Sequence, residues 1–421
     1  MTLRFRAFFL AIASVLYLSA CGETFRPIAT PVTTGGGDPQ ARRHAVVVSN
    51  NGPTADGANT HVNISGDTNA GQVPLGQDPV HAGMNPSGTI TVVVNRASGS
   101  GKASVTGYST FDQPTSPNLP LVSTLPDNSA PSYALVTNTT IYVAMSGINA
   151  VGILLPGAAG LQAQVPVGTT PVAIASLPNA SKIYVVNQGS SDVSVIRTSD
   201  NSVTTTVGVG ASPAWAVASA DSKFVYVVNK GAGNVTVINA DTDAVVNTIA
   251  VGAAPNFAAF DAKNLRVYVT NSGANTVTSI NADANSPAFL TTTTITVGSN
   301  PVSLTPLADG SRVYVANSGS NSVSVVSSLS LAVQSTITVP ATTGMLKPVW
   351  IDSSRDSSKV VVAFQDANPV TTSDPDESAI VTIRASDSVL TTIAAPTSPL
   401  PCVSATAGWC RMKPVFVTIT P

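Results

Sequence analysis

Aromatic and imidazole side chains recur two residues after a set of eight prolines in this chain. The residues two places after those prolines are His81, Tyr133, Ala173, Trp215, Phe257, Ser303, Trp350 and Phe416. Five of the eight are aromatic, although only 5% of the chain is. Aromatic faces can stack on a sugar, a peptide or another flat ligand. If equivalent positions surround one axis, a candidate binding site at a channel mouth comprises His81, Tyr133, Trp215, Phe257, Trp350 and Phe416. The alternative is that these rings pack between structural units as ordinary core.

The three histidines, His44, His61 and His81, do not form a metal site by their spacing. We interpret them as strand-end or surface residues. Only His81 occupies one of the positions that follow a proline by two residues, where a histidine could reach a central channel.

Other chemistry-bearing motifs are incomplete. Asp374, Asp376 and Glu377 could hold calcium through hard oxygen ligands, which makes them a weak candidate metal site. They lack the glycine and the fixed ligand ladder of a calcium loop, so a solvated loop is the favoured interpretation. The segment 99–102 (GSGK) lacks the first glycine and the following Ser or Thr of a phosphate-binding loop. No serine stands in a G-x-S-x-G turn. The sequence therefore predicts no catalytic residues and no cofactor.

The elements that would position these residues repeat about every 42 residues. Four Gly-x-x-Pro motifs open the clearest units, at 168–171, 210–213, 252–255 and 298–301. Each is followed by a strand-like segment that ends in Asn, at 184–187 (YVVN), 226–229 (YVVN), 268–271 (YVTN) and 314–317 (YVAN). Four short apolar runs separated by Gly-rich or polar turns fill each unit, and no helical period occurs. This pattern is typical of a β-propeller.

Eight prolines open the units: Pro79, Pro131, Pro171, Pro213, Pro255, Pro301, Pro348 and Pro414. The chain enters with a second-strand pattern at 43–50, and its last residues supply an opening strand with nothing after it. We therefore predict an all-β propeller of eight four-stranded antiparallel blades, closed by a blade made from both termini, which removes exposed sheet edges. Seven blades is the alternative. The predicted blades span about 43–76 plus 414–421, 79–125, 131–168, 171–210, 213–252, 255–298, 301–339 and 348–395.

The central units resemble the YVTN family of β-propeller repeats, which is common in bacterial and archaeal envelope and surface-layer proteins. The resemblance is close over about 168–340 and loose over 43–167 and 346–421. It is specific for the fold and weak for function. Met145 and Phe364 replace the Asn of the motif. Because that Asn is expected to cap a turn with its side chain, we expect these two turns to be built differently.

The N-terminus has the features of a signal peptide. Arg4 and Arg6 precede an apolar stretch over 7–18 that is too short to span a bilayer. Residues 18–21 (LSAC) then resemble the bacterial lipobox, which implies a signal peptide over 1–20 and lipidation of Cys21. An ordinary signal peptide with a chance cysteine is the alternative. In a Gram-negative lipoprotein, the following Gly22 would favour the outer membrane. Residues 21–40 then form a flexible, lipid-anchored tether, and 41–421 a single propeller domain.

Export places the remaining cysteines in an oxidising compartment, so Cys402 and Cys410 are expected to form a local disulfide. Charged residues make up only 10% of the chain and the net charge is −2, which gives no basic surface for nucleic acid. We expect a monomer that reaches the membrane through its lipid.

These features favour an envelope-anchored binding or scaffold module for a protein or glycan partner, without catalytic activity. Two alternatives remain open. One is a propeller enzyme of lactonase or lyase type with a metal in the central channel. The other is a structural component of a surface layer.

Overall fold

The computed structural model divides the chain into two compact units, residues 1–37 and 38–421, and every described residue belongs to the second. The structure describes residues 44–50, 56–64, 68–97, 102–110, 121–338, 346–366, 378–384, 386–387, 389–394 and 413–420. Within these ranges, no helix is long and apolar enough to cross a membrane.

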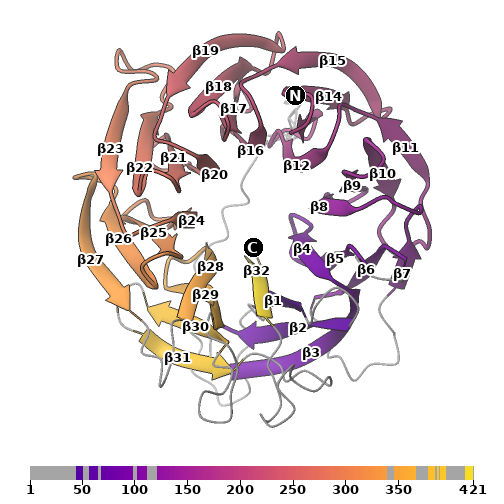
Figure 1. The fold of residues 1–421 in the computed structure, drawn as a ribbon, viewed down its shortest axis with the longest axis horizontal. Helices are drawn as coiled ribbons and strands as arrows, with labels where there is room; N and C mark the ends of the chain where they lie inside the picture. Colours follow the sequence, from indigo (N-terminus) through magenta and orange to yellow (C-terminus); the bar gives the residue numbers. More distant parts are fainter. Residues whose placement is uncertain are drawn as a thin grey trace, which may run out of the picture. The chain divides into compact units, whose positions relative to one another are not determined.

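Eight four-stranded antiparallel sheets are arranged in a ring, which confirms the predicted eight-bladed β-propeller (Figure 1). The inner strands are β32 (Lys413–Ile419), β4 (Pro79–Met84), β8 (Pro131–Val136), β12 (Pro171–Ser176), β16 (Pro213–Ala218), β20 (Pro255–Asp261), β24 (Pro301–Pro306) and β28 (Leu346–Ser353). The second strands are β1 (His44–Asn50), β5 (Ile90–Asn95), β9 (Ile141–Met145), β13 (Lys182–Asn187), β17 (Phe224–Asn229), β21 (Arg266–Asn271), β25 (Arg312–Asn317) and β29 (Lys359–Asp366).

The outer half of each blade is formed by two further strands. The third strands are β2 (Asp56–Asn63), β6 (Ser104–Ser109), β10 (Ala150–Leu154), β14 (Asp192–Arg197), β18 (Asn234–Asn239), β22 (Thr276–Asn281), β26 (Ser322–Ser327) and β30 (Ala379–Arg384). The outer strands are β3 (Thr68–Gln77), β7 (Leu121–Thr124), β11 (Ala163–Pro166), β15 (Ser202–Gly208), β19 (Ala244–Ala250), β23 (Thr292–Thr296), β27 (Ala332–Thr338) and β31 (Val389–Ala394).

The second and third strands of each blade form the core. In β17, Tyr226, Val227 and Val228 are fully buried, because the blade is covered on both faces by its neighbours. Outer strands face solvent instead, and Val245 and Val246 of β19 are exposed. Continuous apolar runs in the middle of each blade are therefore the sequence signature of stacking between blades.

The motif asparagine ties two strands together across their turn. Asn229 Nδ2 donates to Asn234 Oδ1 at 2.7 Å and to Thr236 Oγ1 at 2.8 Å. Asn187, Asn271 and Asn317 make the corresponding pairs of bonds. Where Met145 replaces this Asn, its side chain packs against Gly152, which occupies the position of the second acceptor. An apolar contact thus replaces the hydrogen bonds, as expected for a turn built differently.

The ring is closed by the two ends of the described chain, as predicted. Strand β32 pairs with β1, with Val46 opposite Thr418 and Val47 opposite Val417. Beyond the ladder, Thr420 N donates to His44 O at 2.9 Å, and His44 N donates to Thr420 Oγ1 at 3.1 Å. The sheet order β3-β2-β1-β32 therefore gives this blade the same four strands as the others.

Candidate active site

A β-bulge near the start of every inner strand positions the residue two places after its proline. In β16 the register with β17 shifts between Pro213 and Trp215, so Ala214 is the extra residue. The same shift occurs in the other seven blades. A bulge re-aims the side chain that follows it. The repeated Pro-x-aromatic spacing is thus the sequence signature of a repeated bulge.

Six of these residues meet around the propeller axis and form a closed circuit of ring contacts, called here the aromatic collar: His81, Tyr133, Trp215, Phe257, Trp350 and Phe416. The centroid distances are 3.9 Å for His81–Tyr133, 5.6 Å for Tyr133–Trp215, 4.7 Å for Trp215–Phe257, 5.2 Å for Phe257–Trp350, 4.5 Å for Trp350–Phe416 and 4.4 Å for Phe416–His81. The ring centroids of Trp215 and Trp350 also lie 5.9 Å apart, although β16 and β28 belong to blades that are not neighbours. The rings therefore meet at the axis.

The two remaining positions explain how six rings close a circuit of eight blades. Ala173 and Ser303 are small and buried. The ring contacts that bridge over their blades are Tyr133–Trp215 and Phe257–Trp350. Small residues in these two blades leave room for larger side chains on either side.

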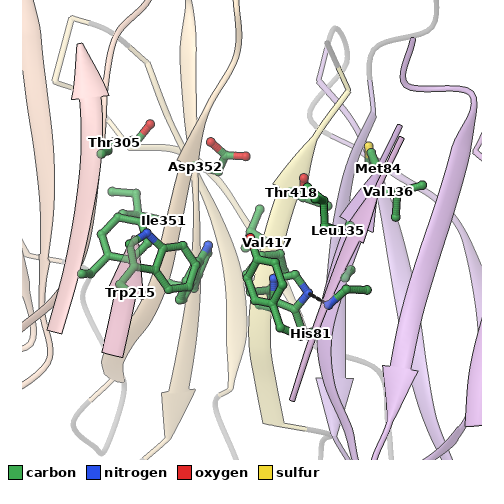
Figure 2. A pocket seen from close by; sticks show the side chains of 18 of the residues that line it. His81, Met84, Leu135, Val136, Trp215, Thr305, Ile351, Asp352, Val417 and Thr418 are labelled. Atoms are coloured by element: carbon green, nitrogen blue, oxygen red, sulfur yellow. Dashed lines mark hydrogen bonds between the residues drawn. The ribbon is translucent and has the colours of Figure 1, made fainter. Parts of the chain in front are cut away.

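A cavity of about 300 Å³ lies against the collar, on the side toward the C-terminal ends of the inner strands. Its wall includes the residues two places further along the strands: Gly83, Leu135, Ala259, Thr305, Asp352 and Thr418. Three of them, called here the polar arc, are Thr305, Asp352 and Thr418, and they come from the consecutive inner strands β24, β28 and β32. In Figure 2 the side chains of these three residues lie above those of Trp215 and His81. The rest of this ring of positions is apolar or glycine.

Asp352 is held in place at the centre of the polar arc. Its Oδ1 accepts a hydrogen bond from Ser353 N at 2.8 Å, and its Oδ2 accepts one from Ile419 N at 3.0 Å. Burial raises the pKa of Asp352 to about 7, against the opposing effects of these two bonds and of the Arg355 charge. The group therefore changes charge near neutral pH, which suits a general acid or base.

His81 has a different role in the wall. Its Nδ1 accepts a hydrogen bond from Ala134 N at 3.2 Å, so the neutral ring carries its proton on Nε2. Burial lowers the pKa of His81 to about 3. Burial also raises the pKa of Tyr133 to about 12. Both groups are therefore uncharged at neutral pH, and His81 can offer a hydrogen bond there without transferring a proton.

The other two histidines are buried and lie away from the collar. His44 is the first residue of β1, as expected for a strand-end residue, whereas His61 lies inside β2 and corrects the interpretation. His44 and His61 contact each other at 5.8 Å between ring centroids, and His61 Nε2 lies 3.3 Å from Tyr108 Oη. Burial, followed by the effect of His44, lowers the pKa of His61 to about 4. In the described part of the chain, no group of three or more His, Cys, Asp or Glu side chains is placed to hold a metal ion.

Several predicted positions lie outside the described residues. They are the signal peptide and tether, Cys21, the weak metal candidates Asp374, Asp376 and Glu377, and the cysteines Cys402 and Cys410.

Asp352 is the residue that sequence reasoning missed. Of the histidines and acids, the sequence analysis assigns only His81 to an inner strand. The signal was nevertheless present. The residues four places after the eight opening prolines are Gly83, Leu135, Ala175, Val217, Ala259, Thr305, Asp352 and Thr418. One acid stands in this otherwise uncharged set.

The comparisons with known proteins identify the fold. No protein-family model matches the chain, and no curated protein matches its sequence. Solved structures do match. A dihydro-heme d1 dehydrogenase, NirN, in complex with DHE aligns with a TM-score of 0.67 and 12% identity over 89% of this chain and 74% of that chain. AztD from Citrobacter koseri aligns with a TM-score of 0.60 and 11% identity over 90% and 98% of the two chains.

A third match is PpgL, a periplasmic gluconolactonase of Pseudomonas aeruginosa, with a TM-score of 0.54 and 18% identity over 70% of this chain and 95% of that chain. At these identities the likeness shows the fold alone. It places this chain among the β-propellers without assigning it to a family.

The expectation of a binding or scaffold module without catalysis is contradicted by these comparisons. Two of the similar propellers are named for an enzymatic activity, a dehydrogenase and a gluconolactonase. They agree better with the alternative of a propeller enzyme of lactonase or lyase type, but the described residues hold no cluster for the central metal of that alternative. A buried carboxyl in the channel, which the sequence interpretation overlooked, agrees with that alternative.

Proposed function

We propose that this protein is a lactonase that opens a small lactone in the cavity above the aromatic collar. The observation that carries the proposal is Asp352, a carboxyl on an inner strand that faces this cavity and titrates near neutral pH. The gluconolactonase among the similar propellers supports the choice of reaction.

The reaction needs one proton shuttle. Ionised Asp352 accepts a proton from a water molecule while the water oxygen attacks the lactone carbonyl carbon. The ring C–O bond then breaks, and the leaving alkoxide takes the proton back from Asp352. The product is an open hydroxy acid, and the carboxyl returns to its starting charge.

The shape of the cavity fits a ligand the size of a single sugar ring. Its volume of about 300 Å³ is at the low end of the range for small-molecule sites, roughly 300–1,000 Å³. Collar rings such as Trp350 and Phe416 offer an apolar surface for the face of such a ring, and the polar arc offers hydrogen-bonding groups on one side.

We further propose that the protein acts in the cell envelope as a lipid-anchored, YVTN-like propeller. The support is the signal-like segment 1–20, the lipobox-like residues ending at Cys21, and the YVTN-like repeats. The lipid would hold the protein at a membrane, in Gram-negative cells the outer membrane.

The test is lactone hydrolysis by the purified full chain, followed by titration of the acid released from glucono-δ-lactone and simpler δ- and γ-lactones. Asp352→Asn should lower kcat by about 100-fold or more, because general base catalysis contributes ~10²–10⁴-fold. The wild-type rate should rise with pH through about 7, as the carboxyl ionises. Asp200→Asn, in an exposed outer turn, is the matched control and should retain the wild-type rate.

Two results would contradict the proposal. One is a full chain that opens none of these lactones faster than buffer. The other is an Asp352→Asn variant that keeps the wild-type rate and pH profile.

A further inference from the structure

The described wall of the cavity contains one acid and no basic residue, and this limits which ligands can bind there. Among the described residues that line it, Asp352 is the only group that becomes charged near neutral pH. His81 and Tyr133 stay neutral, because burial disfavours their charged forms. None of these described lining residues is Lys or Arg. The described part of the cavity wall therefore carries a charge between zero and −1.

Two backbone donors beside the cavity are not available to an anion. Edge N–H groups of inner strands could hold an anion, as oriented amides do elsewhere. Two such donors beside the cavity are already engaged by its own side chains. Ile419 N donates to Asp352 Oδ2 at 3.0 Å, and Ala134 N donates to His81 Nδ1 at 3.2 Å.

Arg355 and Lys359 lie near the polar arc but are not among the described residues that line the cavity. Arg355, whose charge acts on Asp352, is exposed in the turn that follows β28. Lys359 on β29 points to the neighbouring blade, where its Nζ donates to Ile64 O. Facing Asp352 from β24 and β32, the cavity wall presents the uncharged residues Thr305 and Thr418.

From this charge inventory we infer that the site selects uncharged lactones and rejects phosphorylated ones. The inference rests on the proposed function and names its substrate class. A phosphoryl group brings a charge of about −1.5 to −2 at pH 7. In this cavity it would meet a carboxylate and no cation, and a buried charge without a partner is strongly disfavoured.

The same inventory predicts easy product release. Ring opening creates a carboxylate next to ionised Asp352, so the product is repelled where the uncharged substrate was not. The hydroxy acid should therefore inhibit the reaction only weakly, and less at pH 8 than at pH 6.

The experiment compares kcat/KM of the full chain for glucono-δ-lactone and for its 6-phosphate at pH 8. The unphosphorylated lactone should be preferred by about 100-fold or more. Thr418→Lys places a cation on the strand next to Asp352 and should reduce this ratio at least about tenfold. Thr206→Lys is the matched control, because Thr206 is exposed on outer strand β15, and it should leave the ratio unchanged. Thr418→Arg is a second cation variant, for the case that the lysine variant folds poorly.

The outcomes separate the two claims. Equal or faster hydrolysis of the phosphorylated lactone overturns the inference and leaves the lactonase proposal standing. A full chain that opens neither lactone overturns the proposed function, and the inference with it. A strong preference that neither Thr418→Lys nor Thr418→Arg reduces contradicts the charge argument.

Discussion

Two arcs of the propeller differ in what their residues do. The blades that run from β12 to β27 follow the repeat closely. Their motif asparagines connect neighbouring strands, and the tyrosines Tyr184 and Tyr314 connect neighbouring blades. Tyr184 Oη, for example, donates to Asp243 of the next blade at 2.7 Å. The arc formed by β28, β32 and β4 departs from the repeat, and it contributes Asp352, Thr418 and His81 to the cavity.

The residues that repeat most regularly in the sequence are therefore those that stabilise the fold. Where every blade carries the same side chain, that side chain serves a contact that every blade must make. Asp352 has no counterpart at the equivalent positions of the other blades, so no shared architectural need accounts for it. In a repeat protein, a single ionisable residue on an inner strand is therefore the better guide to chemistry.

The largest test of this comparison removes β32. Deleting residues 413–421 takes away the strand that pairs with β1 and the amide of Ile419 that holds Asp352. The ring would then open at two sheet edges, and we expect loss of the cooperative thermal transition and aggregation. Circular dichroism and light scattering would measure both. A truncated chain with the melting midpoint of the full chain would show that closure does not depend on β32.

A smaller effect should appear in the pH dependence of stability. The pKa of Asp352 is raised in the folded state, so its contribution favours folding at low pH and is lost as pH rises through about 7. The stability of wild type relative to Asp352→Asn should fall by about 2–4 kcal/mol between pH 5 and pH 8.5, at ~1.4 kcal/mol per pKa unit. Urea unfolding at the two pH values measures this difference.

Asp200→Asn is the control for that experiment. The pKa of Asp200 is lowered, first by the hydroxyl of Ser202, so its effect belongs below the ordinary aspartate range and outside this window. A constant difference between wild type and Asp352→Asn across the window would mean that Asp352 is not perturbed by burial.

The smallest effect lies in the regular arc, in two tyrosines at equivalent positions. Tyr184→Phe removes the hydrogen bond to Asp243 and should cost about 1–1.5 kcal/mol of unfolding free energy. Tyr226→Phe should be close to neutral or slightly stabilising, because the buried Tyr226 hydroxyl has no hydrogen-bond partner among the described residues. Urea denaturation of both variants measures the difference. Equal losses would mean that the hydrogen bond to Asp243 adds no net stability, because both variants keep the ring and lose only the hydroxyl.

The blade count and the closure were predictable from the sequence because both follow from local pattern. Residues such as Tyr226 and Asn229 recur in each unit and mark the strand repeat. The opening strand at 414–418 supplies the inner strand that the first blade lacks. The collar was partly predictable, since the spacing after each proline is constant. Its closed circuit was not, because the contact between Trp215 and Trp350 depends on a ring that brings distant blades to one axis.

The sequence by itself determined the eight-bladed ring, since strand period, turn residues and apolar runs act over short distances along the chain. Only the tertiary structure decided which residues share the cavity and how they titrate. The sequence shows Asp352 as the one acid among the equivalent inner-strand positions, but it does not show the environment of its carboxyl. Its pKa rises because the fold buries it in the channel wall, and the amide of Ile419, far away along the chain, opposes that rise by donating a hydrogen bond to the carboxyl. Burial and the electrostatic environment are properties of the assembled ring.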